Sequence, residues 1–168
     1  MQNAKDTFYE VLRGRLAALN PERTMVLRGV VRPAVLVEEN ELVATSALPD
    51  CFRLRWTQAA SDPNGALATV AMQCEVDYET AGTAGNSGMD RGRVLAAMDA
   101  ELQAAVNGTP QSAAKSNYAG LASGAAVQPM TTSIWWSQVV FGKVEIKDDR
   151  LARTATVMVM SYEEAGEL

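Results

Sequence analysis

The sequence predicts a single α+β domain over residues 1–168: a mostly antiparallel, twisted sheet with two helices packed on one face, and long loops suited to interactions. Two segments, residues 4–19 and 89–106, repeat apolar side chains every three or four positions, as amphipathic helices do. Residues 67–79 instead alternate apolar and polar side chains, which is typical of an antiparallel strand with one solvated face. The order helix, several strands, helix, two strands therefore favours an α+β architecture.

The composition is that of an ordinary globular protein, with 48% apolar and 21% charged residues in a chain of 168. The formal net charge of -5 argues against a protein that works by neutralising DNA phosphates, because such domains are usually basic. No basic recognition helix is present either, so a DNA-binding regulator is disfavoured. DNA is expected only as cargo that passes the protein.

Histidine is absent, which removes the commonest general base, the commonest metal ligand and every Ser–His or Cys–His nucleophile pair. Cys51 and Cys74 are too few for a zinc or iron–sulfur site. Both lie in apolar alternating segments, so we expect buried free thiols rather than a disulfide, which favours a reducing cytoplasm. No cofactor, metal or membrane span is expected, since no run of about 18 apolar residues occurs.

The first predicted helix, residues 4–19, is expected to begin at an Asn3 cap and to end at Asn20-Pro21. Its other face is charged but not strongly basic, so we interpret it as a helix on a sheet rather than a membrane-surface helix. The apolar positions that carry the prediction are Phe8, Val11, Leu12, Leu16 and Leu19.

Short strand signals follow this helix. The segments TMVLRGVV and RPAVLV are rich in β-branched residues, with Gly29 between them and Pro33 suited to a strand start or edge. In CFRLRWT apolar residues alternate with Arg53 and Arg55, so one side is expected to face a core and the other water. ASDPNGA, which contains Asp-Pro and Asn-Gly, predicts a turn.

The strand predicted at residues 67–79 has the clearest pattern in the chain. Its apolar face consists of Val70, Met72, Cys74, Val76 and Tyr78. Its polar face consists of Thr69, Gln73, Glu75, Asp77 and Glu79. This period of two predicts a strand in an antiparallel sheet with one face buried.

The second predicted helix, about residues 89–106, has Asp90 near its start and Asn107-Gly108 at its end. Its inner face is expected to consist of Val94, Leu95, Met98, Leu102 and Val106. The segment 107–130 is small, polar and glycine-rich without a period, so we expect a long flexible loop there. Two interpretations stay open: an arm that orders against a partner, or a plain insertion.

The chain ends in a predicted hairpin, in which TTSIWWSQVVFGKVEI and RLARTATVMVMSYEE are joined by the charged turn KDDR. Residues 157–160 are apolar on both faces, which suits a central strand. Adjacent strand residues point to opposite faces, so one of Trp135 and Trp136 is expected in the core. The other is expected outside the core, covered by a helix or by a partner.

Gly82, Gly85 and Gly88 join a strand to a helix, which is the position where many proteins hold nucleotide phosphates. The spacing differs from G-x-G-x-x-G, no lysine follows, and Asp90 would compete with a phosphate for the positive end of the helix dipole. We therefore interpret the segment as a strand-to-helix connection. A nucleotide-binding enzyme that uses this 80–90 loop is the alternative from another class.

Charged residues supply further candidates for a site. The acidic ones, on one strand face, are Glu75, Asp77 and Glu79. The basic ones are Arg53 and Arg55 on a strand and Arg91 and Arg93 at the second helix. The carboxylates could form a metal or acid–base pair and the arginines could meet an acidic partner or phosphate. Solvated surface charge is the simpler interpretation of both sets.

The order of elements and several stretches resemble the tail terminator family of long-tailed phages, in its lambda-type members. The matching stretches are residues 12–19, Arg32-Pro33-Ala34-Val35 with Glu38 and Glu39, FRLRW, ATVAMQCEVDYE, DRGRVLAAMDAEL and ARTATVMVMSYEE with Tyr162-Glu163. They span nearly the whole chain. The segment 107–130 and SIWWSQVVFGKVEI depart from the pattern, so another neck or tail-completion protein on a similar scaffold is an alternative.

The resemblance implies a structural virion protein without enzymatic activity, assembled in the host cytoplasm. It would form a hexameric ring in the tail or neck that sits on the last ring of the tail tube, stops tube polymerisation and meets the head–tail connector. Its partners would be copies of itself, the tube protein and the connector or neck protein, with the tape-measure protein as a further candidate.

Such a ring closes when one patch binds a different patch on the next copy. We expect Arg53 and Arg55 to face the carboxylates of Glu75, Asp77 and Glu79 on a neighbouring copy, a pairing that sets register more than affinity. The further candidates for subunit or partner contacts are Arg91, Arg93, Trp135 and Trp136.

Overall fold

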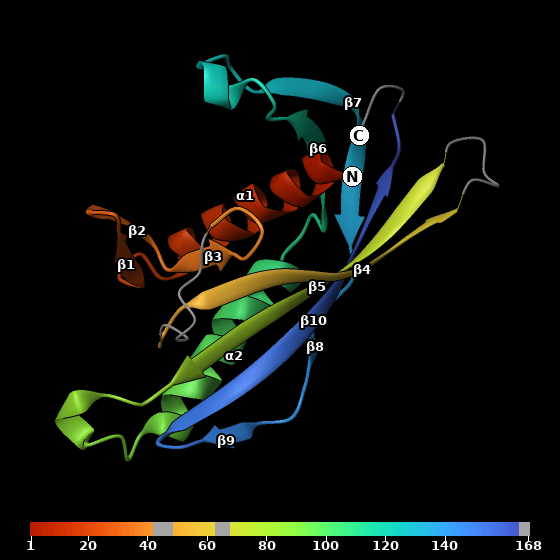
Figure 1. The fold of residues 1–168 in the computed structure, drawn as a ribbon. Helices are drawn as coiled ribbons and strands as arrows, with labels where there is room; N and C mark the ends of the chain where they lie inside the picture. The colour runs from red at the N-terminus through yellow and green to blue at the C-terminus, as the bar shows by residue number, and fades with distance from the viewer. Residues whose placement is uncertain (42–48, 63–67, 165–168) are drawn as a thin grey trace.

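The computed structural model describes residues 1–41, 49–62 and 68–164, which form an α+β fold, as predicted (Figure 1). Its helices are α1 (Gln2–Leu19) and α2 (Arg91–Asn107), with short 3-10 turns η1 (Ala84–Asn86) and η2 (Leu121–Ser123). Its strands are β1 (Thr24–Leu27), β2 (Val30–Pro33), β3 (Val35–Val37), β4 (Phe52–Asp62), β5 (Thr69–Thr80), β6 (Ser112–Asn117), β7 (Gln128–Trp136), β8 (Val140–Phe141), β9 (Glu145–Lys147) and β10 (Arg150–Tyr162).

The main sheet is mostly antiparallel and has the strand order β3-β4-β5-β10-β7-β6. β8 and β9 also pair with β10, so β7, β8 and β9 share one side of that long strand. β10 is therefore central, as its two-sided apolar pattern predicted, and the predicted turn at its start joins it to β9. Figure 1 shows β4, β5 and β10 as long, strongly twisted strands.

Both helices bury their apolar positions in one core against the sheet. The buried helical residues are Ala4, Phe8, Tyr9, Leu12, Leu16, Leu95, Met98, Leu102, Ala105 and Val106. α1 begins one residue before Asn3, so the expected Asn3 cap is wrong. Asn3 is already helical, and its backbone carbonyl accepts a hydrogen bond from the Thr7 hydroxyl at 2.7 Å. The predicted end of α1 before Asn20-Pro21 is confirmed, although Leu19 is exposed.

β5 alternates as predicted, with all five residues of its apolar face buried. The alternation ends at Glu79 and Thr80, which are both buried, because Arg150 pairs with the Glu79 carboxylate. Cys51 and Cys74 are buried free thiols, as predicted. Burial raises the pKa of Cys51 to about 11, so its thiol is protonated at neutral pH.

The segment 107–130 contains regular structure, so the expectation of a structureless loop is wrong. β6 pairs antiparallel with β7, which itself starts within this segment at Gln128. Such an edge strand is held by backbone hydrogen bonds and by packing beside α1, so its small side chains show no hydrophobic period. Tertiary pairing here overrides a sequence pattern typical of a loop.

The turn predicted at ASDPNGA is only partly covered by the structure. Residues 60–62 are still in β4, so the turn begins later than predicted. Residues 63–66 of that turn lie outside the described residues. Within the described part of the chain, no helix combines the length and the apolar character needed to cross a membrane.

Candidate interaction surfaces

The outer face of β4 and β5 carries a ladder of charges in register. Arg53 lies opposite Asp77 and Arg55 opposite Glu75 across the antiparallel pair. A guanidinium nitrogen of Arg55 is 2.6 Å from a Glu75 carboxylate oxygen. A guanidinium nitrogen of Arg53 is 3.5 Å from an Asp77 carboxylate oxygen. The Thr154 hydroxyl on β10 donates to Asp77 at 2.6 Å. Opposite charges directly across two strands stabilise the pairing of those strands.

These pairs lie within one chain, whereas the sequence led us to expect that the arginines meet a neighbour's carboxylates. The sequence placed both sets on the solvated side of the sheet, and the structure agrees. The sequence did not predict that the strand register would place the arginines opposite the carboxylates of the same chain. It also did not predict that Glu79 would form an ion pair with Arg150. A contact between this charged face and another subunit stays a prediction.

A shallow cleft of about 220 Å³ lies over the same face. Its lining includes the apolar Leu36 and Cys51 at one side and the charged Glu145 and Lys147 of β9 at the other. The other charged residues that line it are Arg53, Arg55, Arg153, Asp77 and Glu79, so with Glu145 and Lys147 the lining holds four positive and three negative side chains. Among the residues that the structure describes, no cluster of three or more potential metal ligands occurs.

The glycine-rich loop folds around Asp90. Its carboxylate accepts hydrogen bonds from the backbone N–H and hydroxyl of Thr83, at 2.8 and 2.7 Å, and from the Asn86 amide at 3.0 Å. These bonds, first that of the Thr83 hydroxyl, lower the pKa of Asp90 to about 2. Gly82 has a φ of 76°, and a Cβ there would lie 2.7 Å from the Asp90 carboxylate. The loop therefore already holds an anion of its own.

The two predicted arginines at this loop differ in their surroundings. The Arg91 guanidinium turns back onto the loop and donates from Nε to the Gly88 carbonyl at 2.7 Å. Arg93 is exposed on α2. The structure therefore does not bring Arg91 and Arg93 together with the charged face of β4 and β5.

Trp135 and Trp136 point to opposite faces of β7, as predicted. Trp136 is buried, its indole N–H donates to the Val106 carbonyl at 2.9 Å, and its ring meets that of Phe8 edge-on at 5.5 Å. Trp135 lies on the other face with its ring centre 4.9 Å from that of Tyr162. An aromatic side chain from β10 covers it, rather than a helix.

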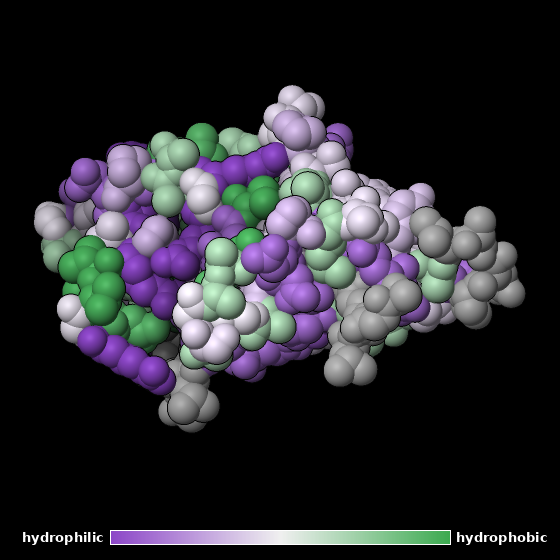
Figure 2. Space-filling model, turned by 90° about the horizontal axis from the view of Figure 1, so that it is seen from above, coloured by the Kyte–Doolittle hydropathy of each residue, from purple (hydrophilic) through white to green (hydrophobic). Residues whose placement is uncertain are grey.

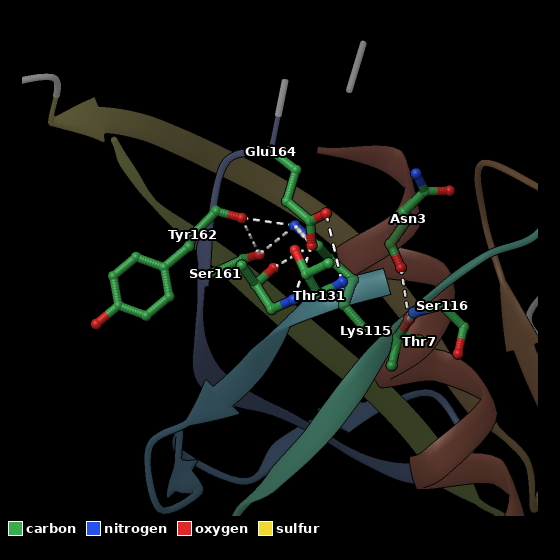
Figure 3. A network of polar contacts seen from close by, with 9 residues as sticks. Asn3, Thr7, Lys115, Ser116, Thr131, Ser161, Tyr162 and Glu164 are labelled. Atoms are coloured by element: carbon green, nitrogen blue, oxygen red, sulfur yellow. Dashed lines mark hydrogen bonds and ion pairs between the residues drawn. The ribbon is translucent and has the colours of Figure 1, made fainter. Parts of the chain in front are cut away.

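A fully buried lysine anchors the end of β10, and the sequence offered no signal for it (Figure 3). The Lys115 ammonium on β6 donates to the Tyr162 carbonyl at 2.6 Å and lies 3.4 Å from the Ser161 hydroxyl. A carboxylate oxygen of Glu164 is 3.8 Å away. Burial of an ammonium group costs free energy unless the group is hydrogen-bonded and paired with a charge. The contacts of Lys115 therefore stabilise the packing of the end of β10 against the β6–β7 edge.

The lowered pKa of the Glu164 carboxyl predicts that the stability of the fold depends on pH. The Thr132 hydroxyl, 2.6 Å away, and the backbone N–H groups of Thr132 and Thr131 lower its pKa from 4.5 to about 2. A lowered carboxyl pKa stabilises the fold above pH 4.5, and this contribution is lost as the pH falls from 4.5 towards 2. We expect wild type to melt above Glu164→Gln at neutral pH, with the gap closing over that range in thermal melts. A gap that stays constant with pH contradicts the assignment.

The β1–β2 hairpin is a two-stranded sheet of its own, outside the main sheet. Met25 and Leu27 on one face pack towards a small cluster of Ala34, Leu36 and Cys51. The other side chains of its apolar set are exposed: Val26 by 66%, Val30 by 63% and Val31 by 67%. Figure 2 shows hydrophobic residues gathered over this hairpin, at the left of the view. Val30 pairs with Leu27 and so belongs to the first face, whereas Val26 and Val31 lie opposite each other on the other face. We call Val26 and Val31 the hairpin surface.

A second exposed apolar group lies at β9, next to the turn into β10. Ile146 is exposed by 80%, and Val144 just before the strand is also exposed. All three residues of β9 are exposed, and β10 is the only described strand that pairs with it. One backbone edge of β9 is therefore open in the described chain. We call Val144, Ile146 and this edge the β9 surface.

No protein-family model matches this chain, and no curated protein matches it.

Proposed function

We propose that this chain is a structural subunit that acts by self-association. Copies of it join into a hexameric ring that caps a phage tail tube, ends tube polymerisation and joins the tail to the head connector. The ring is part of the virion, in the tail or neck, and performs no catalytic step. The family in this proposal comes from the resemblance of sequence stretches, and the self-association is supported by the exposed surfaces.

The observation that best supports self-association is the exposure of the hairpin surface. Val26 and Val31, a cross-strand pair on a separate two-stranded sheet, remain exposed by 66% and 67% in the single chain. Contiguous exposed apolar residues mark interaction sites, because their burial by a partner is favourable. A two-stranded hairpin is also only marginally stable by itself, so a partner stabilises it further.

The charged groups support a role without turnover. The carboxylates of Glu75, Asp77 and Glu79 are each within an ion pair to an arginine of the same chain. At the glycine-rich loop, Asp90 accepts the hydrogen bonds that a bound phosphate would need. At both candidate sites these carboxylates therefore already have partners within the same chain.

The test is to add the purified chain to its tail tube protein during polymerisation and to measure tube length by electron microscopy. We expect shorter tubes with a ring at one end. Rings that leave tube length unchanged favour another neck protein, and a chain without any effect on tubes or self-association contradicts the proposal. A thermal-shift panel of nucleotides and divalent metals tests the enzyme alternative, since a ligand at 100 times its dissociation constant stabilises by about 2.7 kcal/mol.

A further inference from the structure

We infer that neighbouring copies join head to tail, with the hairpin surface of one copy seated on the β9 surface of the next. This inference rests on the proposed ring and names its contact. It differs from the pairing of β4 arginines with β5 carboxylates expected from the sequence, because those groups are already paired within the chain.

The two surfaces lie at opposite borders of the main sheet. The hairpin leads directly into β3, the terminal strand on one side. β9 lies on the far side of β10, so β4, β5 and β10 stand between the two. At about 4.8 Å per strand spacing the borders are roughly 19 Å apart along the sheet. Figure 1 shows the hairpin and β9 on different sides of the molecule.

Both surfaces combine exposed apolar side chains with a strand edge that pairs with no further strand among the described residues. Val26 lies directly opposite Val31 across the hairpin, which makes a continuous β-branched patch. Ile146 is the most exposed residue of the β9 surface, in a strand with an open edge. A hairpin strand laid along that edge adds backbone hydrogen bonds to apolar contact, which is the β-augmentation mode of recognition.

The charges at the turn of the β1–β2 hairpin and at the turn from β9 to β10 are complementary. Arg28 is exposed in the turn of the hairpin, and no ion pair to it occurs within the described residues. Asp148 and Asp149 are exposed in the turn from β9 to β10, and Asp149 lies 3.9 Å from the Arg150 guanidinium. Glu145 and Lys147 on β9 are 3.7 Å apart and offset each other. Arg28 at the turn of the hairpin and Asp148 at the turn from β9 to β10 favour this orientation over hairpin-to-hairpin contact, in which the arginines would repel.

Two different patches on each copy give a heterologous interface, which is the kind that generates a ring when the rotation closes. A second copy of this chain is therefore the occupant that fits both surfaces at once. A self-complementary dimer would use the same patch twice and would stop at two copies.

The experiment uses two full-length variants in sedimentation velocity, Val31→Lys on the hairpin surface and Ile146→Lys on the β9 surface. Each is expected to weaken association by more than about tenfold and to sediment as a monomer where wild type assembles. Mixed in equal amounts, they are expected to form a heterodimer, because each retains the surface that the other needs. Leu121→Lys, at an exposed apolar residue of η2 outside both surfaces, is the control and is expected to assemble as wild type.

The outcomes separate the two proposals. If wild type and either surface variant assemble alike, or if the mixed variants stay monomeric, the contact is wrong while the ring proposal stands. If wild type stays monomeric at every concentration and on tail tubes, the ring proposal fails and the contact with it. Thermal melts within about 2 °C of wild type establish that the variants are folded, as expected for exposed positions.

Discussion

Trp136→Ala is expected to lower the free energy of unfolding by about 3–5 kcal/mol, as large-to-small changes of buried aromatic residues do. Trp136 is 5% exposed and fills the space between β7 and the helices. Its removal leaves a cavity beside Phe8 and deprives the Val106 carbonyl of its indole donor. Urea denaturation monitored by far-UV circular dichroism measures the change.

Trp135→Ala is the matched control, because the same residue type is removed from the opposite face of the same strand. It loses the contact with the Tyr162 ring, so a decrease of about 1 kcal/mol is expected. If the two variants lose equal stability, the assignment of Trp136 to the core and Trp135 to the outer face is wrong.

Lys115→Met is expected to lower the free energy of unfolding by about 1–3 kcal/mol, because it leaves the Tyr162 carbonyl without its charged donor. Methionine keeps much of the volume but cannot donate to the Tyr162 carbonyl or neutralise Glu164. The Glu164 carboxylate then stays next to the apolar site without its cation. Equilibrium denaturation in urea measures the loss.

The double variant Lys115→Met with Glu164→Gln separates charge pairing from packing. Glutamine keeps an oxygen that accepts the Thr132 hydrogen bonds and removes the uncompensated charge. We expect the double variant to be less destabilised than the sum of the two single changes, by 0.5–3 kcal/mol, the usual range for coupled neighbours. Simple additivity contradicts a functional ion pair between Lys115 and Glu164.

The long periodic elements were predictable from the sequence because each buries one face. α1, α2 and β5 repeat their apolar residues at the period of the element, and β10 is apolar on both faces because it is central. The opposite orientation of Trp135 and Trp136 followed from strand geometry alone. β6 was missed because an edge strand held by backbone bonds has no such pattern, and its one buried polar residue, Lys115, is of a type that is almost never fully buried.

The candidate surface was predictable in residue type and sheet face but not in partners. Alternation placed Arg53, Arg55 and the β5 carboxylates on the solvated face, yet only the register between β4 and β5 decides which atoms meet. The hairpin surface was missed for a related reason. β-Branched residues predict strands, whereas their exposure depends on whether another element covers them.

The central claim is that the chain works as one of several identical copies, and native mass spectrometry of the purified wild-type chain tests it most directly. We expect a hexamer as the largest closed species, with intermediates between monomer and hexamer that disappear as concentration rises. A heterologous interface that closes predicts this series. A monomer that persists at every concentration, or a series that stops at the dimer, contradicts the claim.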